Sequence, residues 1–332
     1  MESNNTRKWL KSHHDTLFPF FPYLKKRRIE WLFDRLEQKG AEKGALYVQT
    51  FNLGLRKVLG RRGSGEEVIE KLNTVRAFFP LLSIDLLYDI PGQGKTDVIA
   101  DVQKAIEIGM DGISVYPLIY SPKTAISKKF VPPPIEMAKA VFGTVKRFLE
   151  DNGYRHLNIN HFTNGRDKFQ YSTYFNRLAN VLGLGAGATG FVADCFLKHT
   201  FTSKKYIQKK NNTVGNVFSV PENVIPVLWC VSQIQYGRID IETPRREWDF
   251  EPLDAFAGTL KRGVDRGELI IAKNTIELTS EGMFWANTIG AEMAVEYLYN
   301  GKGTLVSLEE STAKIAKAIM LNKLRLRSKR RN

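Results

Sequence analysis

The run LSIDLLY at residues 82–88 is followed by a helical segment over residues 97–108 and by a second short run, GISVYPL, at residues 112–118. Both runs have the length and apolar content of buried parallel strands. The segment between them carries apolar residues at helical spacing, so one of its faces is apolar. Strand, helix and strand within about 38 residues form a βαβ unit. Such units build parallel sheets, so the sequence predicts an α/β fold.

One carboxylate interrupts the first of these strands. Asp85 lies among apolar residues, and a buried carboxylate is costly unless it is paired or hydrogen-bonded. It could cap a neighbouring loop, or it could contact a ligand at the open end of the sheet, where parallel α/β folds place their sites. The strand alone leaves both interpretations open.

A phosphate-binding loop is suggested by the segment DIPGQGKT at residues 89–96, which ends like the motif GxxxxGK[ST]. The first glycine of that motif is replaced by Asp89, whose charge and Cβ oppose a close phosphate. Pro91 also removes one backbone donor. The sequence therefore does not predict ATP or GTP binding.

The length and composition limit the classes of protein to which the chain can belong. A chain of 332 residues can bury one large domain and a small one, and 43% hydrophobic with 25% charged residues is ordinary for a soluble globular protein. No apolar run approaches the ~20 residues that span a bilayer, and no secretory segment opens the chain. With only Cys195 and Cys230, no disulfide framework is expected. We therefore expect no membrane span and a cytoplasmic location.

The net charge of +14 is concentrated in two basic blocks, at residues 25–28 and from Lys314 to the C-terminus. Such blocks are solvated faces or tails in most proteins. The alternative is that they bind nucleic acid, anionic lipid or a polyanionic small molecule.

Four parts are predicted along the chain: an N-terminal arm and helix over 1–44, an α/β domain over 45–200, a helical module over 201–300 and a basic tail over 301–332. The third part ends in a hairpin over 267–278 and a helix capped by Thr279. This order indicates a small α+β module similar to a winged helix. Further local signals predict a helix capped by Ser64, a strand over 154–162 and a helix over 253–266.

Six motifs occur in an order that is found in one known family. The chain resembles the oxygen-independent coproporphyrinogen III oxidase-like radical SAM proteins, a group that includes haem chaperones and anaerobic haem-degrading methyltransferases. The resemblance covers roughly residues 45–295, and the arm is most similar to the haem-degrading branch. The motifs are QTFN at 49–52, LGR at 59–61, SIDLLY at 83–88 with PGQ at 91–93, SVY at 114–116, LGLGAGA at 182–188 and LTSEG at 278–282.

The resemblance implies a binding site for S-adenosylmethionine. Gln49, Arg61 and Asp85 correspond to contacts with this cofactor, and Ile119 and Thr189 fall at positions that line the same nucleoside pocket. Amide and carboxylate groups could bind ribose or amino groups, and an arginine could pair with the methionine carboxylate. In the family, S-adenosylmethionine is cleaved reductively to a 5′-deoxyadenosyl radical, which leads to hydrogen abstraction or methyl transfer on a tetrapyrrole.

The chain departs from this family at the iron–sulfur cluster. The family holds a [4Fe–4S] cluster through three cysteines in a CxxxCxxC run, whereas Cys195 and Cys230 lie 35 residues apart. About three strand–helix units, each of roughly 30 residues, are also missing between Val48 and Gln49. The resemblance therefore implies a partial, open TIM-type barrel with residues 47–51 in an edge strand beside the Asp85 strand. An exposed edge of this kind favours self-association.

Three functions follow. The first is a radical SAM protein of anaerobic haem or porphyrin metabolism that is inactive because its cluster ligands are missing. The second is a non-catalytic haem- or tetrapyrrole-binding protein in which His156, His161 or His199 ligates iron. The third is a winged-helix nucleic-acid binder that uses the basic tail.

Overall fold

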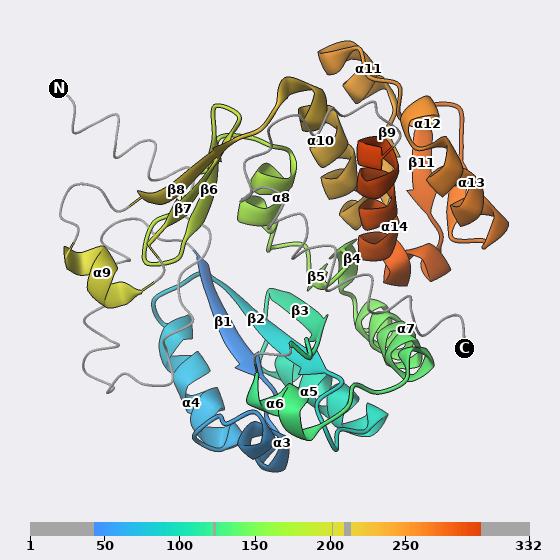
Figure 1. The fold of residues 1–332 in the computed structure, drawn as a ribbon. Coiled ribbons are helices and arrows are strands. Elements are labelled where there is room, and N and C mark those ends of the chain that lie inside the picture. The colour runs from blue at the N-terminus through green and yellow to red at the C-terminus, as the bar shows by residue number, and fades with distance from the viewer. Residues whose placement is uncertain (1–42, 122–123, 201, 209–213, 300–332) are drawn as a thin grey trace. The chain divides into compact units, whose positions relative to one another are not determined.

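A computed structural model describes residues 43–121, 124–200, 202–208 and 214–299 (Figure 1). These residues form two compact units, which divide between Tyr171 and Ser172. Nearly all of the predicted arm and the whole basic tail lie outside the described residues. The predicted domain limits at 44, 200 and 300 stay predictions.

The first unit is built on a five-stranded sheet with the strand order β1-β2-β3-β5-β4. Strands β1, β2 and β3 are parallel, whereas β5 runs antiparallel to both β3 and β4. The βαβ unit predicted from the sequence is β2, α5 and β3, so the predicted α/β class is confirmed. The strands are β1 (Lys43–Gln49), β2 (Leu81–Tyr88), β3 (Gly112–Pro117), β4 (Arg155–Asn158) and β5 (His161–Thr163).

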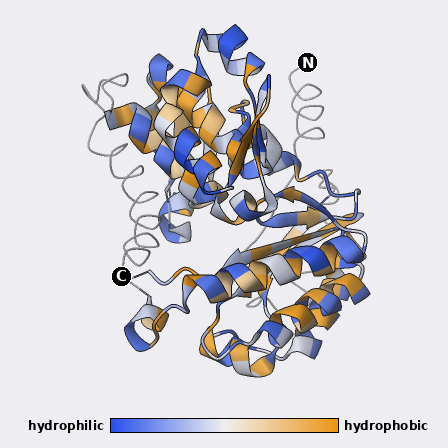
Figure 2. Ribbon diagram, turned by 90° about the vertical axis from the view of Figure 1, so that its right-hand side faces the viewer, coloured by the Kyte–Doolittle hydropathy of each residue, from blue (hydrophilic) through white to orange (hydrophobic). Residues whose placement is uncertain are grey.

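The apolar face of this sheet packs under its helices. Leu82, Ile84 and Leu86 alternate along β2 and are completely buried, as the period of two in a strand requires. Hydrophobic and hydrophilic residues alternate along the helices (Figure 2), which is typical of amphipathic helices. The helices of the first unit are α3 (Leu53–Val58), α4 (Gly65–Arg76), α5 (Lys95–Glu107), α6 (Ala125–Lys129) and α7 (Ile135–Asp151), and α8 (Gln170–Asn176) crosses the division between the two units.

Strand β1 lies at one end of the strand order. Among the described residues it pairs only with β2, so the predicted edge position beside the Asp85 strand is confirmed for this part of the chain. Tyr47 pairs with Asp85 but Gln49 pairs with the next residue of β2, which makes a bulge at Val48. The predicted junction between Val48 and Gln49 therefore lies inside one irregular strand. The missing units and the self-association stay predictions.

Two strands differ from the sequence prediction. One ends earlier than predicted, and the other is divided into two strands. The strand predicted to reach Phe51 ends at Gln49, because Asn52 already caps α3 by accepting from the amide of Gly54 at 2.8 Å. The single strand predicted over 154–162 is instead the hairpin β4–β5. Its turn is closed by the side chain of Asn158, which accepts from the amide of His161 at 3.0 Å.

The second unit holds two three-stranded sheets, ordered β6-β7-β8 and β10-β11-β9. The predicted hairpin is β10–β11, and Thr279 caps the last helix by accepting from the amide of Gly282 at 3.0 Å, so both predictions are confirmed. The helix predicted over 253–266 is broken at Phe256. The strands are β6 (Thr189–Val192), β7 (Cys195–His199), β8 (Val214–Ser219), β9 (Arg238–Asp240), β10 (Leu269–Ile271) and β11 (Thr275–Leu278).

The helices of the second unit are short except the last. They are α9 (Ser203–Gln208), α10 (Ile225–Gln233), α11 (Glu242–Trp248), α12 (Pro252–Ala255), α13 (Ala257–Asp265) and α14 (Ser280–Tyr299), with 3-10 turns at Glu222–Val224 and Ile234–Tyr236. Among the helices of the described residues, none is both long and apolar enough to cross a membrane.

Asp111 ties the amino-terminal ends of β2 and β3 together. Its buried carboxylate accepts from the amide of Leu82 at 2.8 Å and pairs with Arg76 at 3.1 Å and Arg166 at 2.8 Å. These contacts join α4, β2, β3 and the loop after β5. A buried acceptor that satisfies a backbone amide is costly to remove.

We expect Asp111→Ala to destabilise the protein by about 2–3 kcal/mol, because it leaves a buried amide unsatisfied and removes both ion pairs. Urea unfolding followed by circular dichroism measures this change. The matched control is Asp151→Ala at the exposed end of α7, which should stay within about 0.5 kcal/mol of the parent. Equal effects of the two substitutions would contradict the assigned role of Asp111.

Candidate functional site

The side of the sheet opposite the apolar residues is polar. Tyr47 pairs with Asp85, Asp85 with Ser114, and Ser114 with His161, so these side chains form one row across four strands. Residues two apart share a face of a strand, which extends the row to a larger polar face. We define the polar face by Lys43, Tyr47, Ser83, Asp85, Ser114, Tyr116 and His161.

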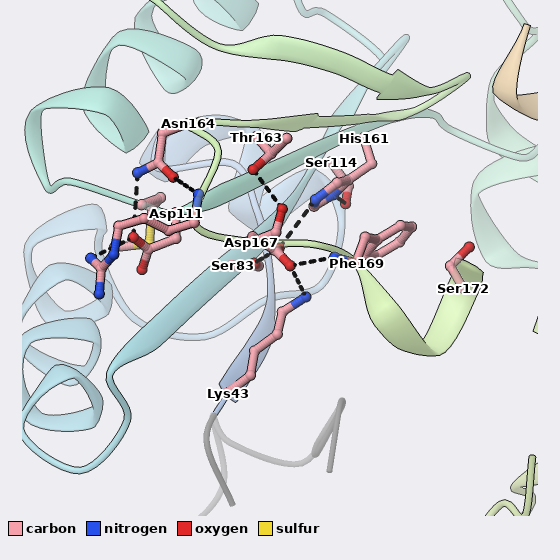
Figure 3. A network of polar contacts seen from close by, with 12 residues as sticks. Lys43, Ser83, Asp111, Ser114, His161, Thr163, Asn164, Asp167, Phe169 and Ser172 are labelled. Carbon is pink, nitrogen blue, oxygen red and sulfur yellow. Dashed lines mark hydrogen bonds and ion pairs between the residues drawn. The ribbon is translucent and has the colours of Figure 1, made fainter. Parts of the chain in front are cut away.

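A buried network joins the strands of the polar face (Figure 3). The ammonium group of Lys43 lies 2.8 Å from Oδ1 of Asp167, and Ser83 donates to Oδ2 of the same carboxylate. Oδ2 also lies 3.1 Å from Nε2 of His161. The other ring nitrogen of His161, Nδ1, lies 2.8 Å from the hydroxyl of Ser114. Burial of every member makes the network strongly coupled, because the local dielectric is low.

The network is packed closely on all sides. A Cβ at Gly112 would lie 2.2 Å from Oδ2 of Asp167 and 2.6 Å from the ring of His161, so only glycine fits at this position of β3. The ring of Phe169 stacks on His161 with a centroid separation of 3.9 Å, and the ammonium of Lys43 lies 5.1 Å from the centroid of the Phe169 ring. The geometry of the acid, the imidazole and the ammonium is therefore constrained.

The protonation states in this network follow from burial and charge. Burial alone would raise the pKa of Asp167, but the neighbouring imidazole of His161 and the charge of Lys43 lower it well below its ordinary value. Burial lowers the pKa of His161, against the opposing effect of Asp167. We therefore assign Asp167 as a carboxylate and His161 as a neutral imidazole at pH 7.

The pKa of Asp85 is shifted in the opposite direction from that of Asp167. Burial raises its pKa to about 6, although a hydrogen bond from Ser114 and the charge of Lys43 would lower it. Its carboxylate also contributes, after burial, to the raised pKa values of Tyr47 and Tyr116. The two phenols therefore stay neutral at pH 7 and can act as hydrogen-bond donors beside Asp85.

The connection from Asp167 through His161 to Ser114 has the order of an acid–base–nucleophile triad. Ser114 is only 1% exposed and His161 is completely buried, so no substrate carbonyl can reach the hydroxyl. Because both ring nitrogens of His161 already lie beside polar partners, this residue also does not fit the predicted role of an iron ligand. The arrangement therefore favours a role of these residues in positioning Asp85 over a reaction at Ser114.

Two of the residues predicted to bind S-adenosylmethionine lie in direct contact. Arg61 donates from Nε to the side-chain oxygen of Gln49 at 2.6 Å. Gln49 is the last residue of β1 and has a φ of 70°. Asp85 is not at a strand end as predicted, because β2 continues to Tyr88. The carboxylate lies instead in the polar row, next to Tyr47.

The loops that carry this pair are fixed by Arg56, which is 3% exposed. Its guanidinium donates to the carbonyl oxygens of Thr50 and Arg62 at 2.9 Å each, and also to those of Val48 and Gly63. One side chain thus holds the segment after β1 against the loop that contains Arg61. Arg56 is a positioning residue for the Gln49–Arg61 pair.

The other two residues predicted to line the nucleoside pocket, Ile119 and Thr189, do not contact the Gln49–Arg61 pair in any hydrogen bond of the described residues. Ile119 follows the carboxyl end of β3 and is 63% exposed. Thr189 begins β6 and belongs to the second unit. Gln93 of the PGQ motif closes the loop after β2, because its side chain donates to the carbonyl oxygen of Leu87 at 3.1 Å and accepts from the amide of Ile90 at 3.1 Å.

The residues present do not fit the [4Fe–4S] cluster that the resemblance implies. Cys195 is partly buried on β7 and Cys230 is completely buried in α10. Within the described ranges, no group of three or more histidine, cysteine, aspartate or glutamate residues could hold a metal ion. A cluster held by three thiolates requires a third cysteine, which the sequence lacks. No reaction step is therefore assigned to a cluster in this chain.

Sequence reasoning missed most of the buried network. Ser83 and Ser114 were detectable, because each lies on the same face as a neighbouring polar residue within an otherwise apolar strand. Lys43 and Asp167 lie 124 residues apart, and neither is marked by any local pattern. Only the fold brings them together.

No family model matches the chain, but several curated proteins do. It is 25% identical over 266 residues to the oxygen-independent coproporphyrinogen III oxidase of Escherichia coli (strain K12), which covers 71% of this chain and 56% of the relative. It is 29% identical over 171 residues to the heme chaperone HemW of Lactococcus lactis, covering 49% and 45% of the two chains. It is 25% identical over 268 residues to the anaerobilin synthase of Escherichia coli O157:H7, covering 75% and 58%. The chain thus spans about half the length of the curated relatives that it matches.

A solved structure shares the fold. The coproporphyrinogen III oxidase (HemN) from Escherichia coli, described as a radical SAM enzyme, superposes with a TM-score of 0.67 at 21% identity, over 82% of this chain and 68% of that one. The resemblance predicted from the sequence motifs is confirmed. The homologues of this chain are the HemN-like coproporphyrinogen III oxidases, the HemW heme chaperones and anaerobilin synthase.

Proposed function

We propose that this chain is a protein of haem or porphyrin metabolism that binds an S-adenosylmethionine-like nucleoside near the carboxyl ends of β1 and β2 and holds no [4Fe–4S] cluster. The relatives, a coproporphyrinogen III oxidase, a heme chaperone and an anaerobilin synthase, support the tetrapyrrole part of the proposal. The nucleoside part rests on one observation, the contact between Gln49 and Arg61. The remaining donors of Arg61 suit a carboxylate, while Asp85 suits a hydroxyl or amino donor.

The proposal assigns binding rather than radical chemistry to this chain. In the family, cluster iron anchors the methionine end of the cofactor, and here that anchor has no ligands. The proposed nucleoside contacts are Gln49, Arg61 and Asp85, with Ile119 as a further proposed contact in the same unit; the predicted contact of Thr189, which belongs to the second unit, stays a prediction. We therefore propose that the site binds the nucleoside weakly.

The domain organisation belongs to the same proposal. A partial, open barrel is supported by the edge position of β1. A winged-helix-like module is supported by the chain order α10, β9, α11, α12, α13 and the hairpin β10–β11. Nucleic-acid binding gains no support from the described residues, because the basic tail lies outside them.

We expect anaerobic reconstitution with iron and sulfide to leave the protein without a [4Fe–4S] cluster, since two separated thiols cannot replace three clustered ones. Iron and acid-labile sulfide analysis with Mössbauer spectroscopy measures the content. The control is the double variant Cys195→Ser/Cys230→Ser, which should behave like the parent. Stoichiometric cluster in the parent that is lost in the double variant would overturn this prediction.

For S-adenosylmethionine we expect a dissociation constant of about 1 mM, measured by saturation-transfer NMR. Arg61→Ala should weaken binding about tenfold, because it removes a charge-assisted hydrogen bond. Arg62→Ala is the matched control, since Arg62 is an exposed arginine in the same loop. Micromolar affinity in the parent, or equal loss in both variants, would show that the site is assigned wrongly.

A non-catalytic haem-binding function is favoured by one further observation, at His199. This side chain is 6% exposed, and neither ring nitrogen has a hydrogen-bond partner in the described part of the chain. His156 is enclosed differently: its ring stacks on Phe162 at 4.3 Å, and burial lowers its pKa to about 4. Of the three predicted ligands, His199 is the one that we propose for iron.

Titration with haem, followed at the Soret band, tests this assignment. We expect His199→Ala to weaken haem binding at least about tenfold, because it removes an axial ligand, and we expect added imidazole to restore the spectrum. His156→Ala serves as the control and should retain the parent spectrum. If His156→Ala abolishes the band and His199→Ala does not, the ligand is His156. If the parent shows no band at all, haem binding itself is refuted.

A further inference from the structure

The side chain of His199 is enclosed without being satisfied. It is the last residue of β7 and is 6% exposed. Both ring nitrogens are buried, and neither has a hydrogen-bond partner among the described residues. Burying a polar group without a hydrogen bond is costly, so the site holds an unused ligand group. A ligand can reach it only if some part of the surrounding chain moves away.

The ring of Tyr206, in α9, packs against this imidazole. The two rings meet edge to face, with their centroids 5.6 Å apart and their planes at 72°. The phenol oxygen of Tyr206 accepts a hydrogen bond from the amide of Gly185 at 3.2 Å. An edge-to-face ring pair and one neutral hydrogen bond each stabilise a contact only modestly. The covering of His199 by Tyr206 can therefore be undone at small cost.

Helix α9 has little besides Tyr206 to hold it in place. Of its six residues, Tyr206 is partly buried and all the others are exposed, including Ile207 at 75%. A helix of this length is not stable by itself in water. Segments with few buried side chains open locally at a much lower cost than the whole protein. Release of Tyr206 therefore frees α9 from its contacts with the body.

The loop before β6 is held to β7 independently of α9. The amide of Gly187 donates to the carbonyl oxygen of Thr200 at 3.0 Å, and the amide of His199 donates to that of Ala188 at 2.9 Å. Gly185 and Gly187 have φ values of 110° and 77°, which glycine adopts without strain. The loop and β7 thus stay together when the phenol detaches, and the part that moves is α9.

We propose that Tyr206 gates the His199 site, and that iron of a haem binds only after the Tyr206 ring and α9 have moved away from the imidazole. This inference rests on the proposed haem-binding function and adds the way in which the ligand enters. In the closed arrangement both nitrogens are buried, so only the open fraction of molecules can bind. The apparent affinity for haem is lowered by that fraction.

Modification by diethyl pyrocarbonate, followed for each histidine by peptide mass spectrometry, tests the gate without haem. The reagent acylates an accessible imidazole nitrogen, so its rate at His199 reports the open fraction. We expect Tyr206→Ala to raise this rate at least about tenfold, because both the ring and the acceptor are removed. Tyr206→Phe keeps the ring and should raise the rate less. Since alanine is the best helix former, unwinding of α9 does not explain a faster rate.

Ile207→Ala is the matched control, because Ile207 is the exposed neighbour of Tyr206 in the same helix. This variant should react at the rate of the parent. The completely buried His161 is the internal reference and should stay unreactive in every variant. Thermal unfolding establishes that the variants are folded. Equal rates at His199 in the parent and in Tyr206→Ala would overturn the gate.

Stopped-flow mixing with haem, followed at the Soret band, supplies the second measurement. We expect Tyr206→Ala to raise the association rate constant about tenfold and to leave the dissociation rate constant within about twofold, because the gate acts only before binding. Faster dissociation with unchanged association would show that Tyr206 contacts the bound haem instead, and the gate would be refuted. No binding of haem by the parent would refute the haem function, while the diethyl pyrocarbonate rates would still decide whether Tyr206 closes the site.

Discussion

The buried ion pair between Lys43 and Asp167 is the constraint on which the polar face depends. The two side chains are 4% and 1% exposed, and removing two charges from water costs several kcal/mol per ion unless their geometry and remaining hydrogen bonds are good. Here Asp167 gains Ser83 and the imidazole of His161 as further partners. The pair therefore stays charged only where β1, β2, β3 and β5 are already assembled in one sheet. Its burial ties the first strand of the sheet to a loop that the chain reaches 124 residues later.

From this pair the polarity of the whole face follows. The carboxylate of Asp167 lies beside the imidazole of His161, the imidazole lies beside the hydroxyl of Ser114, and Ser114 pairs in register with Asp85. The opposite face needs no such device, since Leu82, Ile84 and Leu86 are buried under helices by the hydrophobic effect alone. One face thus supplies stability, while the other holds charged groups at defined positions. This division is the usual condition for a site on a rigid element.

The sequence predicted those features that depend on residues close to one another in the chain. The βαβ unit, the Ser64 cap and the Thr279 cap were predictable, because each depends on residues within a few positions of one another. Asp85 was recognisable as an anomaly in an apolar strand. The partner of Lys43 was not predictable, since no short-range pattern marks a pairing across 124 residues. The hairpin β4–β5 was missed because the turn depends on the side chain of Asn158, which reads as an ordinary strand residue in a periodic pattern.

The loops at the carboxyl ends of the strands are held by the chain's own hydrogen bonds. Arg56 fixes the segment after β1, Asp101 of α5 accepts from the amide of Phe51 at 2.8 Å, and Gln93 closes the loop after β2. None of these contacts needs a cofactor. A site preorganised in this way keeps its geometry when a metal anchor is lost, because the ordering entropy of the loops is offset by internal contacts rather than by the ligand. The hydrogen bond between Gln49 and Arg61 therefore does not depend on a bound metal, and the proposed nucleoside contacts can form in a chain whose two cysteines do not fit a cluster.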